Sequence, residues 1–184
     1  MIFDMESITF ITSHPKKAEQ LSWHLNYPVD HQNLDLQEIQ SLDLGEVVSS
    51  KAREAFKLVR KPVLVEDMSF RFVAFGKLPG PFIKWFLQEL KVGGLCKLLD
   101  GYDDRGAVAE VSFALYNGKN LNVFDGQMEG TIAQSPRGDA GFGTDSIFIP
   151  NGSKKTWGEM SEEEQIETSV RRIALKKLED FLRR

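Results

Sequence analysis

The sequence predicts a mixed α/β fold, in which helices and strands alternate early in the chain and a hairpin follows late. Residues 7–13 are rich in β-branched and aromatic side chains, which favours a buried strand, and Pro15 suits the first position of a following helix. Apolar residues from Val48 to Val59 recur at helical spacing. Asn117 and Gly118 separate two strand-like segments, and this pair favours a hairpin because both residues tolerate positive φ.

Each predicted element ends where proline, glycine or polar residues interrupt its pattern. The expected order is a strand at 7–13, a helix at 15–25, a strand at 29–34, a helix at 48–59, a short strand at 63–65, a turn at 78–81, a helix from Phe82 that breaks at Gly93-Gly94, a short helix at 95–99, strands at 107–116 and 121–129, a glycine-rich loop at 135–143, a strand at 147–149 and one last helix. Ser161 and Glu164 form a capping box for the last helix, whose apolar face extends from Ile166 to Phe181.

Length and composition limit the class of protein. The 184 residues suit one domain, or one domain with a smaller lobe, and 41% hydrophobic with 27% charged residues excludes a disordered chain. A net charge of −4 without a basic stripe argues against nucleic acid as a partner. No uncharged apolar run approaches about 18 residues, and acids lie among the first residues, so we expect a cytoplasmic protein with no membrane segment.

The turn from Thr12 to Lys17 is the first candidate site. A strand that leads into a helix N-terminus presents unpaired N–H groups and a partial positive charge, which suits a phosphate. Lys17 lies one turn into the helix and could reach a bound phosphate. An ordinary capped helix with solvated lysines fits the same residues.

The acidic pair Glu66-Asp67, directly after the apolar run 63–65, is the second candidate. The carboxyl end of a buried strand is where open α/β sheets bind ligands, and the repulsion between neighbouring carboxylates favours a divalent cation or a raised pKa. A polar strand end that faces water is the alternative.

The loop at 136–145 is the third candidate. Its three glycines would let the backbone approach a ligand, and Phe142 offers a ring that could stack on a base. A surface loop whose Phe142 packs inward is the alternative. Taken singly, Lys51 and Arg171 are typical of solvated charges, and Glu38 is typical of a polar connection.

Along nearly the whole chain, these segments resemble the inosine triphosphate pyrophosphatase family, whose members hydrolyse non-standard purine nucleoside triphosphates to the monophosphate and pyrophosphate. The resemblance rests on residues 8–12 with Lys17, 35–38, Lys51-Ala52 with Ala55, 63–67, 78–86, Gly126 with 130–132, 136–138, 141–143 with Asp145, 147–148, Thr156 with 159–160, and Ser169 with Arg171. It implies an elongated α/β fold, a mixed sheet with flanking helices and two lobes around a central cleft. It also implies a homodimer of single domains that span residues 1–184, each with a smaller lobe inserted around residues 70–130.

The same resemblance implies a role for each matched residue. The catalytic residues would be Asp67 as the general base, Glu66 and Lys17. The ligands of Mg²⁺, or of Mn²⁺ in its place, would be Glu38, Glu66 and Asp67. The nucleotide substrate would be bound by Thr12, Ser13, His14, Lys17, Lys51, Phe142, Asp145, Ser169 and Arg171, with Phe142 stacked on the base.

The chain departs from the family pattern at several of these positions. Ser13 and His14 stand where the turn normally has Gly and Asn, and Thr144, Gln165 and Val170 replace an aromatic residue, a Lys and a His at the base end. A site that loses a hydrogen-bond donor loses discrimination between bases, so we expect an altered base specificity. Two alternatives remain open: a non-catalytic nucleotide-binding homologue, and a pyrophosphatase for pyrimidine or modified nucleotides like the septum-inhibitor-like enzymes.

Overall fold

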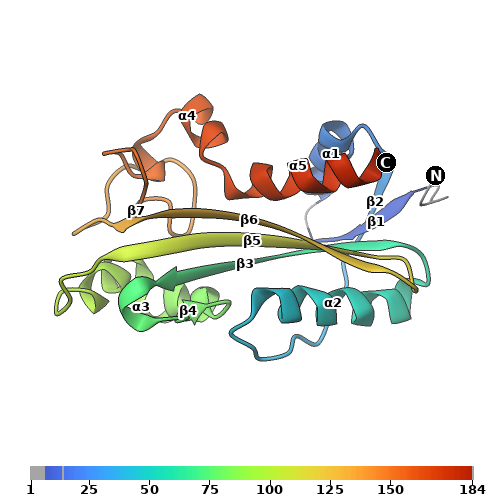
Figure 1. The fold of residues 1–184 in the computed structure, drawn as a ribbon, viewed down its shortest axis with the longest axis horizontal. Coiled ribbons are helices and arrows are strands. Elements are labelled where there is room, and N and C mark those ends of the chain that lie inside the picture. The colour runs from blue at the N-terminus through green and yellow to red at the C-terminus, as the bar shows by residue number, and fades with distance from the viewer. Residues whose placement is uncertain (1–6, 14, 184) are drawn as a thin grey trace. The chain divides into compact units, whose positions relative to one another are not determined.

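In a computed structural model, which describes residues 7–13 and 15–183, the chain forms a sheet flanked by helices (Figure 1). Its elements in chain order are β1 (Ile8–Ile11), α1 (Pro15–Leu25), β2 (Val29–Gln32), α2 (Leu44–Val59), β3 (Val63–Phe72), the 3₁₀ helix η1 (Val73–Phe75), β4 (Pro79–Gly80), α3 (Ile83–Leu98), β5 (Gly106–Tyr116), β6 (Leu121–Ile132), β7 (Phe148–Pro150), the 3₁₀ helix η2 (Trp157–Glu159), α4 (Glu162–Glu167) and α5 (Val170–Leu182).

Seven strands of the described residues form one mixed sheet in the order β2-β1-β3-β5-β6-β7, with β4 paired to β3. β1 is parallel to β2 and to β3, whereas the β3–β4 and β6–β7 pairs are antiparallel. The predicted mixed α/β class is therefore confirmed, and β5 and β6 are the two strands that the Asn117-Gly118 turn connects.

The chain divides into two compact units, each assembled from discontinuous segments. Unit 1 comprises Met1–Asp67, Val111–Gly126 and Ile173–Arg184, and unit 2 comprises Met68–Glu110 and Gln127–Arg172. The boundaries fall inside β3, β5, β6 and α5, so these four elements contribute residues to both units.

In unit 1, α2 covers one face of the strands, and α1 and α5 cover the other (Figure 1). Val48, Ala52 and Ala55 of α2 are completely buried in one cluster with Val63 and Val65 of β3. Asp43 caps this helix, since its side chain accepts a hydrogen bond from the N–H of Glu46. The predicted apolar stripe of this helix is thus the interface between α2 and the sheet.

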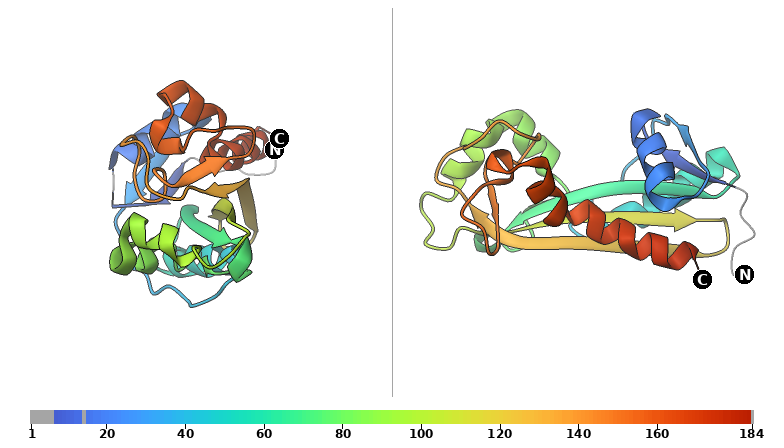
Figure 2. Two further views of the ribbon diagram at one scale, coloured as in Figure 1. Left: turned by 90° about the vertical axis from the view of Figure 1, so that its left-hand side faces the viewer. Right: turned by 90° about the horizontal axis from the view of Figure 1, so that it is seen from above.

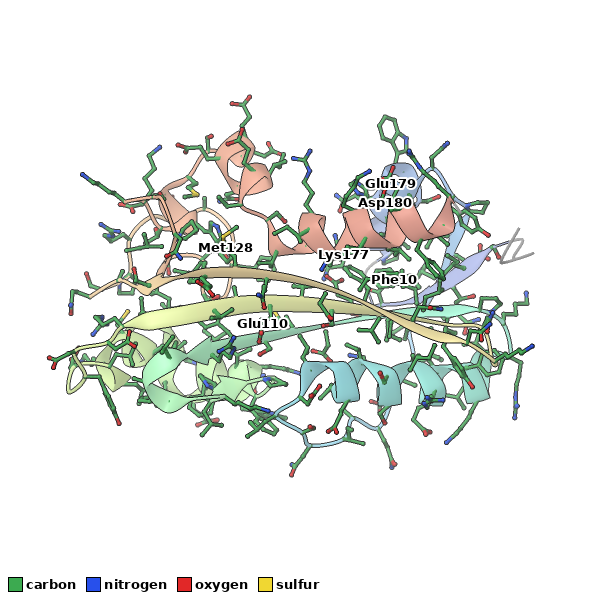
Figure 3. All side chains as sticks on the ribbon, in the orientation of Figure 1. Phe10, Glu110, Met128, Lys177, Glu179 and Asp180 are labelled. Atoms are coloured by element: carbon green, nitrogen blue, oxygen red, sulfur yellow. The ribbon has the colours of Figure 1, made fainter. Side chains whose placement is uncertain are left out.

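On the opposite face of unit 1, the residues of α5 from Ile173 onward run along β6 (Figure 2). Phe181 of α5 lies 5.2 Å from Phe124 of β6 between ring centroids, and Nζ of Lys177 donates to the backbone oxygen of Asp125. Phe10 of β1 is buried on this side of the strands (Figure 3).

The core of unit 2 is rich in aromatic side chains. The ring of Phe70 lies 6.0 Å from that of Phe72 and 5.3 Å from that of Phe148, in edge-on contacts. Trp157 packs against Phe148 at 4.4 Å. The guanidinium of Arg105 donates to three backbone carbonyl oxygens and so joins α3 to the end of β6.

The prediction of a short strand at 63–65 was wrong, because β3 extends to Phe72. Glu66 and Asp67 therefore lie inside a ten-residue strand and not at its end. Phe70 and Phe72 are completely buried, and backbone pairing with β4 supports the strand there. The strand therefore extends beyond the acidic pair because its later residues bury aromatic side chains in the core.

The prediction of one last helix was also wrong, because α4 and α5 are separate helices. Between them, Oγ1 of Thr168 donates to the backbone oxygen of Glu164 and accepts a hydrogen bond from Nε1 of Trp157 at 2.8 Å. A hydroxyl that bonds to the backbone competes with the helical hydrogen-bond pattern. The capping box of Ser161 and Glu164 is present as predicted, at the start of α4.

The break in α3 lies at Lys91, whose φ is 56°, and not at Gly93-Gly94. A Cβ atom on Gly94 would lie 2.8 Å from Cβ of Leu90, so this glycine serves close packing within the helix. Trp23 and Trp85 are exposed. Within the described residues, no helix is long and apolar enough to cross a bilayer.

Gly118 provides a test of the packing in unit 1. Its φ is 92°, and a Cβ atom would lie 2.3 Å from Cζ of Phe56; Gly152 has a similar φ of 86°, but no described atom lies within 4 Å of its Cβ position. We expect Gly118→Ala to lower the free energy of unfolding by about 1–3 kcal/mol more than Gly152→Ala does. Urea denaturation of both variants measures the difference, and equal losses would contradict the close contact with Phe56.

Candidate active site

Lys51 joins two carboxylates that come from different elements of unit 1. Its Nζ lies 2.7 Å from Oε1 of Glu38, 3.1 Å from Oδ2 of Asp67 and 3.5 Å from the backbone oxygen of Glu66. Lys51 belongs to α2, Asp67 to β3, and Glu38 to the connection between β2 and α2. We call Lys51, Glu38 and Asp67 the lysine–carboxylate cluster.

The packing of α2 explains the position of Lys51. On a helix surface, residues three and four apart are neighbours, so Lys51 lies beside the buried Val48 and Ala55. Side chains of a strand alternate between its two faces, so Asp67 shares the face of Val65, which packs against α2. Burial of the apolar stripe therefore brings the ammonium to the carboxylate.

The cluster is partly shielded from solvent. The side chains of Lys51 and Asp67 are 17% and 21% exposed, and that of Glu38 is 54% exposed. Burial by itself would lower the pKa of Lys51, but the charge of Asp67 and the hydrogen bond to Glu38 outweigh it and raise the pKa above its usual value of 10.5. Lys51 is therefore a charged ammonium at neutral pH, shared by two carboxylates.

Glu66 lies on the other face of β3, together with Leu64, because neighbouring strand residues point in opposite directions. Among residues 7–13 and 15–183, no group of three or more His, Cys, Asp and Glu side chains is placed to share a metal ion. Glu38 and Asp67 are the two predicted ligands that meet at one point. The metal site formed by all three acids stays a prediction.

The turn after β1 lies near the acidic pair along the strands. β1 and β3 are parallel, with Phe10 opposite Leu64, and extension of this register by two residues aligns Thr12 with Glu66. Because parallel strands run in the same direction, the predicted phosphate turn and the acidic pair lie at the same level of the sheet.

The described residues of this turn agree with the predicted strand-to-helix connection. α1 begins at Pro15, Ser13 is exposed, and Lys17 is half-buried in the first turn of the helix. His14, which we expected to contact the substrate, lies outside the described residues.

The predicted base end of the site lies in unit 2. Phe142 is 78% exposed, so its ring does not pack inward, and its N–H donates to Oδ2 of Asp145 over 2.8 Å. Burial raises the pKa of Asp145, and the hydrogen bond from Phe142 offsets only part of that rise. Gly141 has a φ of 76°, and a Cβ atom there would lie 2.1 Å from the Asp145 carboxylate, so the loop conformation requires glycine.

Three of the residues that depart from the family pattern take part in the packing of unit 2. Nε2 of Gln165 donates to the backbone oxygen of Trp157 over 2.7 Å. Thr144 and Val170 are both buried. These side chains therefore stabilise the unit in which they lie.

Ser169 and Arg171 lie at the start of α5. Oγ of Ser169 accepts a hydrogen bond from the N–H of Arg172 at 3.3 Å, as a helix cap does, and Arg171 is half-buried in the first turn. The structure thus places both residues in unit 2 with Phe142 and Asp145, whereas Thr12, Lys17 and the lysine–carboxylate cluster belong to unit 1.

Two residues that match the family pattern, but to which the sequence assigned no function, position the glycine-rich loop. Oγ1 of Thr156 donates to the backbone oxygen of Arg137 at 2.8 Å, and the Glu159 carboxylate accepts from the N–H of Thr156 and lies 3.4 Å from the Arg137 guanidinium. Thr156 and Glu159 form a capping box around η2. Their spacing, a Thr followed three residues later by a Glu, was the available signal.

The fold and the site define a mixed α/β protein in which a lysine and two carboxylates meet beside a pair of parallel strands. The chain belongs to the Ham1 family, whose sequence profile matches residues 8–181.

Proteins with known names support this assignment. The inosine triphosphate pyrophosphatase of Schizosaccharomyces pombe is 38% identical over 182 residues, which cover 97% of this chain and 96% of that protein. The inosine triphosphate pyrophosphatase of Yarrowia lipolytica is 41% identical over 182 residues, covering 96% of this chain and 95% of that protein. The structure of the Staphylococcus aureus Ham1 protein matches with a TM-score of 0.88 at 25% identity, over 96% of this chain and 98% of that one. The predicted family is confirmed.

The lysine–carboxylate cluster makes a prediction about stability. Lys51→Gln should lower the free energy of unfolding near neutral pH by about 2 kcal/mol, because both carboxylates lose a charged donor. The folded-state pKa of Lys51 is raised, so this stabilisation is fully present below pH 10.5 and is lost as the pH rises through the folded-state pKa. Denaturation of both proteins from neutral pH to above that value measures the difference.

Lys57→Gln is the matched control, since Lys57 lies on the same helix with its side chain 62% exposed and pairs with Glu54. Its cost should stay within about 0.5 kcal/mol. A Lys51→Gln variant as stable as this control would show that the cluster contributes nothing to the fold.

Proposed function

We propose that this protein is a metal-dependent pyrophosphatase that hydrolyses nucleoside triphosphates to the nucleoside monophosphate and pyrophosphate. The observation that carries the proposal is the lysine–carboxylate cluster, which combines an ammonium suited to phosphate with carboxylates suited to a cation. The relatives from Schizosaccharomyces pombe and Yarrowia lipolytica, both named inosine triphosphate pyrophosphatase, support this reaction class.

The acids of the cluster suit Mg²⁺, or Mn²⁺ in its place. Oxygens of Glu38 and Asp67 already converge on one cation, the ammonium of Lys51. Proteins usually hold Mg²⁺ through one or two carboxylates together with substrate phosphates. Glu38 and Asp67 would hold the ion, and the bound ion would neutralise charge that develops on the phosphates.

The residues of unit 1 would bind the triphosphate and activate water. Thr12, Ser13 and Lys17 would hold the phosphates at the turn after β1, and Lys51 would hold them from α2. Asp67 would orient a water molecule and accept its proton while the water oxygen bonds to phosphorus of the α–β anhydride. The anhydride bond then breaks, and pyrophosphate leaves.

The residues of unit 2 would bind the base. Phe142 would stack on it, and Asp145, Ser169 and Arg171 would contact its edge. An altered base specificity is part of the proposal, because Gln165 donates to a backbone oxygen, and Val170 is buried and has no polar group. The proposed enzyme is a homodimer and acts in the cytoplasm.

The assignment of Asp67 as the general base predicts the effect of Asp67→Asn. This change keeps the shape of the side chain and removes its basicity, so the rate of pyrophosphate release should fall at least about 100-fold. Glu54→Gln, which removes a carboxylate of α2 that pairs with Lys57 and lies outside the cluster, should leave the rate unchanged. Near-normal turnover by a folded Asp67→Asn variant would refute the assigned role.

A panel of nucleotides tests the reaction and the base preference together. Standard, deaminated, oxidised and pyrimidine triphosphates are compared, with pyrophosphate and orthophosphate measured separately and the Schizosaccharomyces pombe relative assayed beside this protein. We expect pyrophosphate as the product and a preference for deaminated purines that is weaker than about 10⁴-fold.

Three outcomes of this panel would contradict the proposal. Release of orthophosphate alone would mean that another bond breaks. Absence of turnover with every nucleotide, while calorimetry shows that the nucleotides bind, would favour a non-catalytic homologue. Turnover confined to pyrimidine or modified nucleotides would show that the substrates are not non-standard purine nucleotides.

A further inference from the structure

The ammonium of Lys51 is fully engaged by protein oxygens. A lysine ammonium has three N–H donors, and the three oxygens around Nζ are Oε1 of Glu38, Oδ2 of Asp67 and the backbone oxygen of Glu66, at 2.7, 3.1 and 3.5 Å. The Lys51 side chain is 17% exposed, so it lies against β3 and does not extend into solvent. A phosphate that binds this ammonium must take the place of at least one of these oxygens.

We propose that Lys51 is an exchangeable counter-ion, which neutralises Glu38 and Asp67 until a divalent cation replaces it and frees the ammonium for the phosphates. The inference rests on the proposed function, since it takes Glu38 and Asp67 as metal ligands. It adds that the lysine and the metal compete, so that the protein binds a cation weakly alone and more tightly together with a polyphosphate.

The electrostatics of the cluster support an exchange. The point at which the two carboxylates converge is filled by Nζ, and a divalent cation near the same point would be repelled by the ammonium in this partly shielded site. A displaced ammonium without a counter-ion would raise the free energy of the protein. The negatively charged phosphates of the substrate would supply that counter-ion.

The elements that carry the cluster permit such a movement. Lys51 has a flexible four-carbon side chain, whereas its backbone is fixed by the buried residues beside it on α2. Glu38 lies in a connection without regular structure, and its side chain is 54% exposed. The ammonium and the Glu38 carboxylate can therefore separate without disturbing the core of unit 1.

Amine labelling of the wild-type protein tests the release of Lys51 directly. Brief acetylation followed by peptide mass spectrometry gives the labelling rate of Lys51, with Lys57 on the same helix as the internal control. Saturating Mg²⁺ without nucleotide should raise the rate at Lys51 severalfold and leave the rate at Lys57 unchanged. An unchanged or lower rate at Lys51 would overturn the proposal.

Binding of Mn²⁺ alone, measured from the spin-resonance signal of the free ion, gives a second test. Lys51→Gln should bind Mn²⁺ about tenfold more tightly than wild type, because the competing ammonium is gone and one to two charged hydrogen bonds no longer have to break. Lys51→Arg, which keeps the charge, should show no such gain, and Lys57→Gln should match wild type. Equal or weaker binding by a folded Lys51→Gln variant, confirmed by circular dichroism, would overturn the exchange.

Glu38→Gln separates failure of this inference from failure of the proposed metal site. If Glu38→Gln weakens Mn²⁺ binding and Lys51→Gln does not strengthen it, the exchange is wrong and the metal site stands. If neither change alters Mn²⁺ binding, the exchange and the metal site are both wrong, while release of pyrophosphate still reports separately on hydrolysis.

Discussion

The burial of α2 against the strands of unit 1 is the constraint on which the candidate site depends. Val48, Ala52 and Ala55 have small or branched side chains that let the helix approach β3 closely, and none of them is exposed. Removal of this apolar surface from water is the dominant favourable term in such packing. Because Lys51 lies beside this stripe, the interaction that stabilises the unit also places a positive charge next to β3. Lys51 and Asp67 are therefore held by the core, whereas Glu38 reaches them from the connection between β2 and α2.

Charge balance decides what this position can do. The single positive charge of Lys51 neutralises only one of the two negative charges of Glu38 and Asp67. At a partly buried position, well-packed apolar side chains often stabilise a protein as well as an ion pair does. A cluster of this kind therefore points to chemistry more than to stability. Asp145 offers a contrast, since its half-buried carboxylate accepts a hydrogen bond from a backbone N–H and holds the conformation of the Phe142 loop.

The departures from the family pattern are unevenly spread between the two units. In unit 1, the acids and the two lysines, Lys17 and Lys51, that are proposed to hold the metal and the phosphates match the family pattern. Only Ser13 and His14, in the turn after β1, differ from it. In unit 2, Gln165 and Val170 have become part of the local packing. Phosphate chemistry needs charges, which any matching acid or lysine supplies, whereas base recognition needs particular donors in particular places. The second requirement is the one that substitution changes most easily.

The sequence by itself determined the elements that local signals specify: the helical stripe of α2, the hairpin turn at Asn117-Gly118 and the capping box at Ser161. It also named the residues of the candidate site, because motif types and their order are visible in one dimension. Only the tertiary structure decided the length of β3, the separation of α4 from α5 and the meeting of Lys51 with Glu38 and Asp67. Each of these features depends on partners that lie elsewhere in the sequence, such as Trp157 for Thr168 and α2 for Asp67. Local propensities cannot predict them, because a propensity describes one residue and not the position of its tertiary partner.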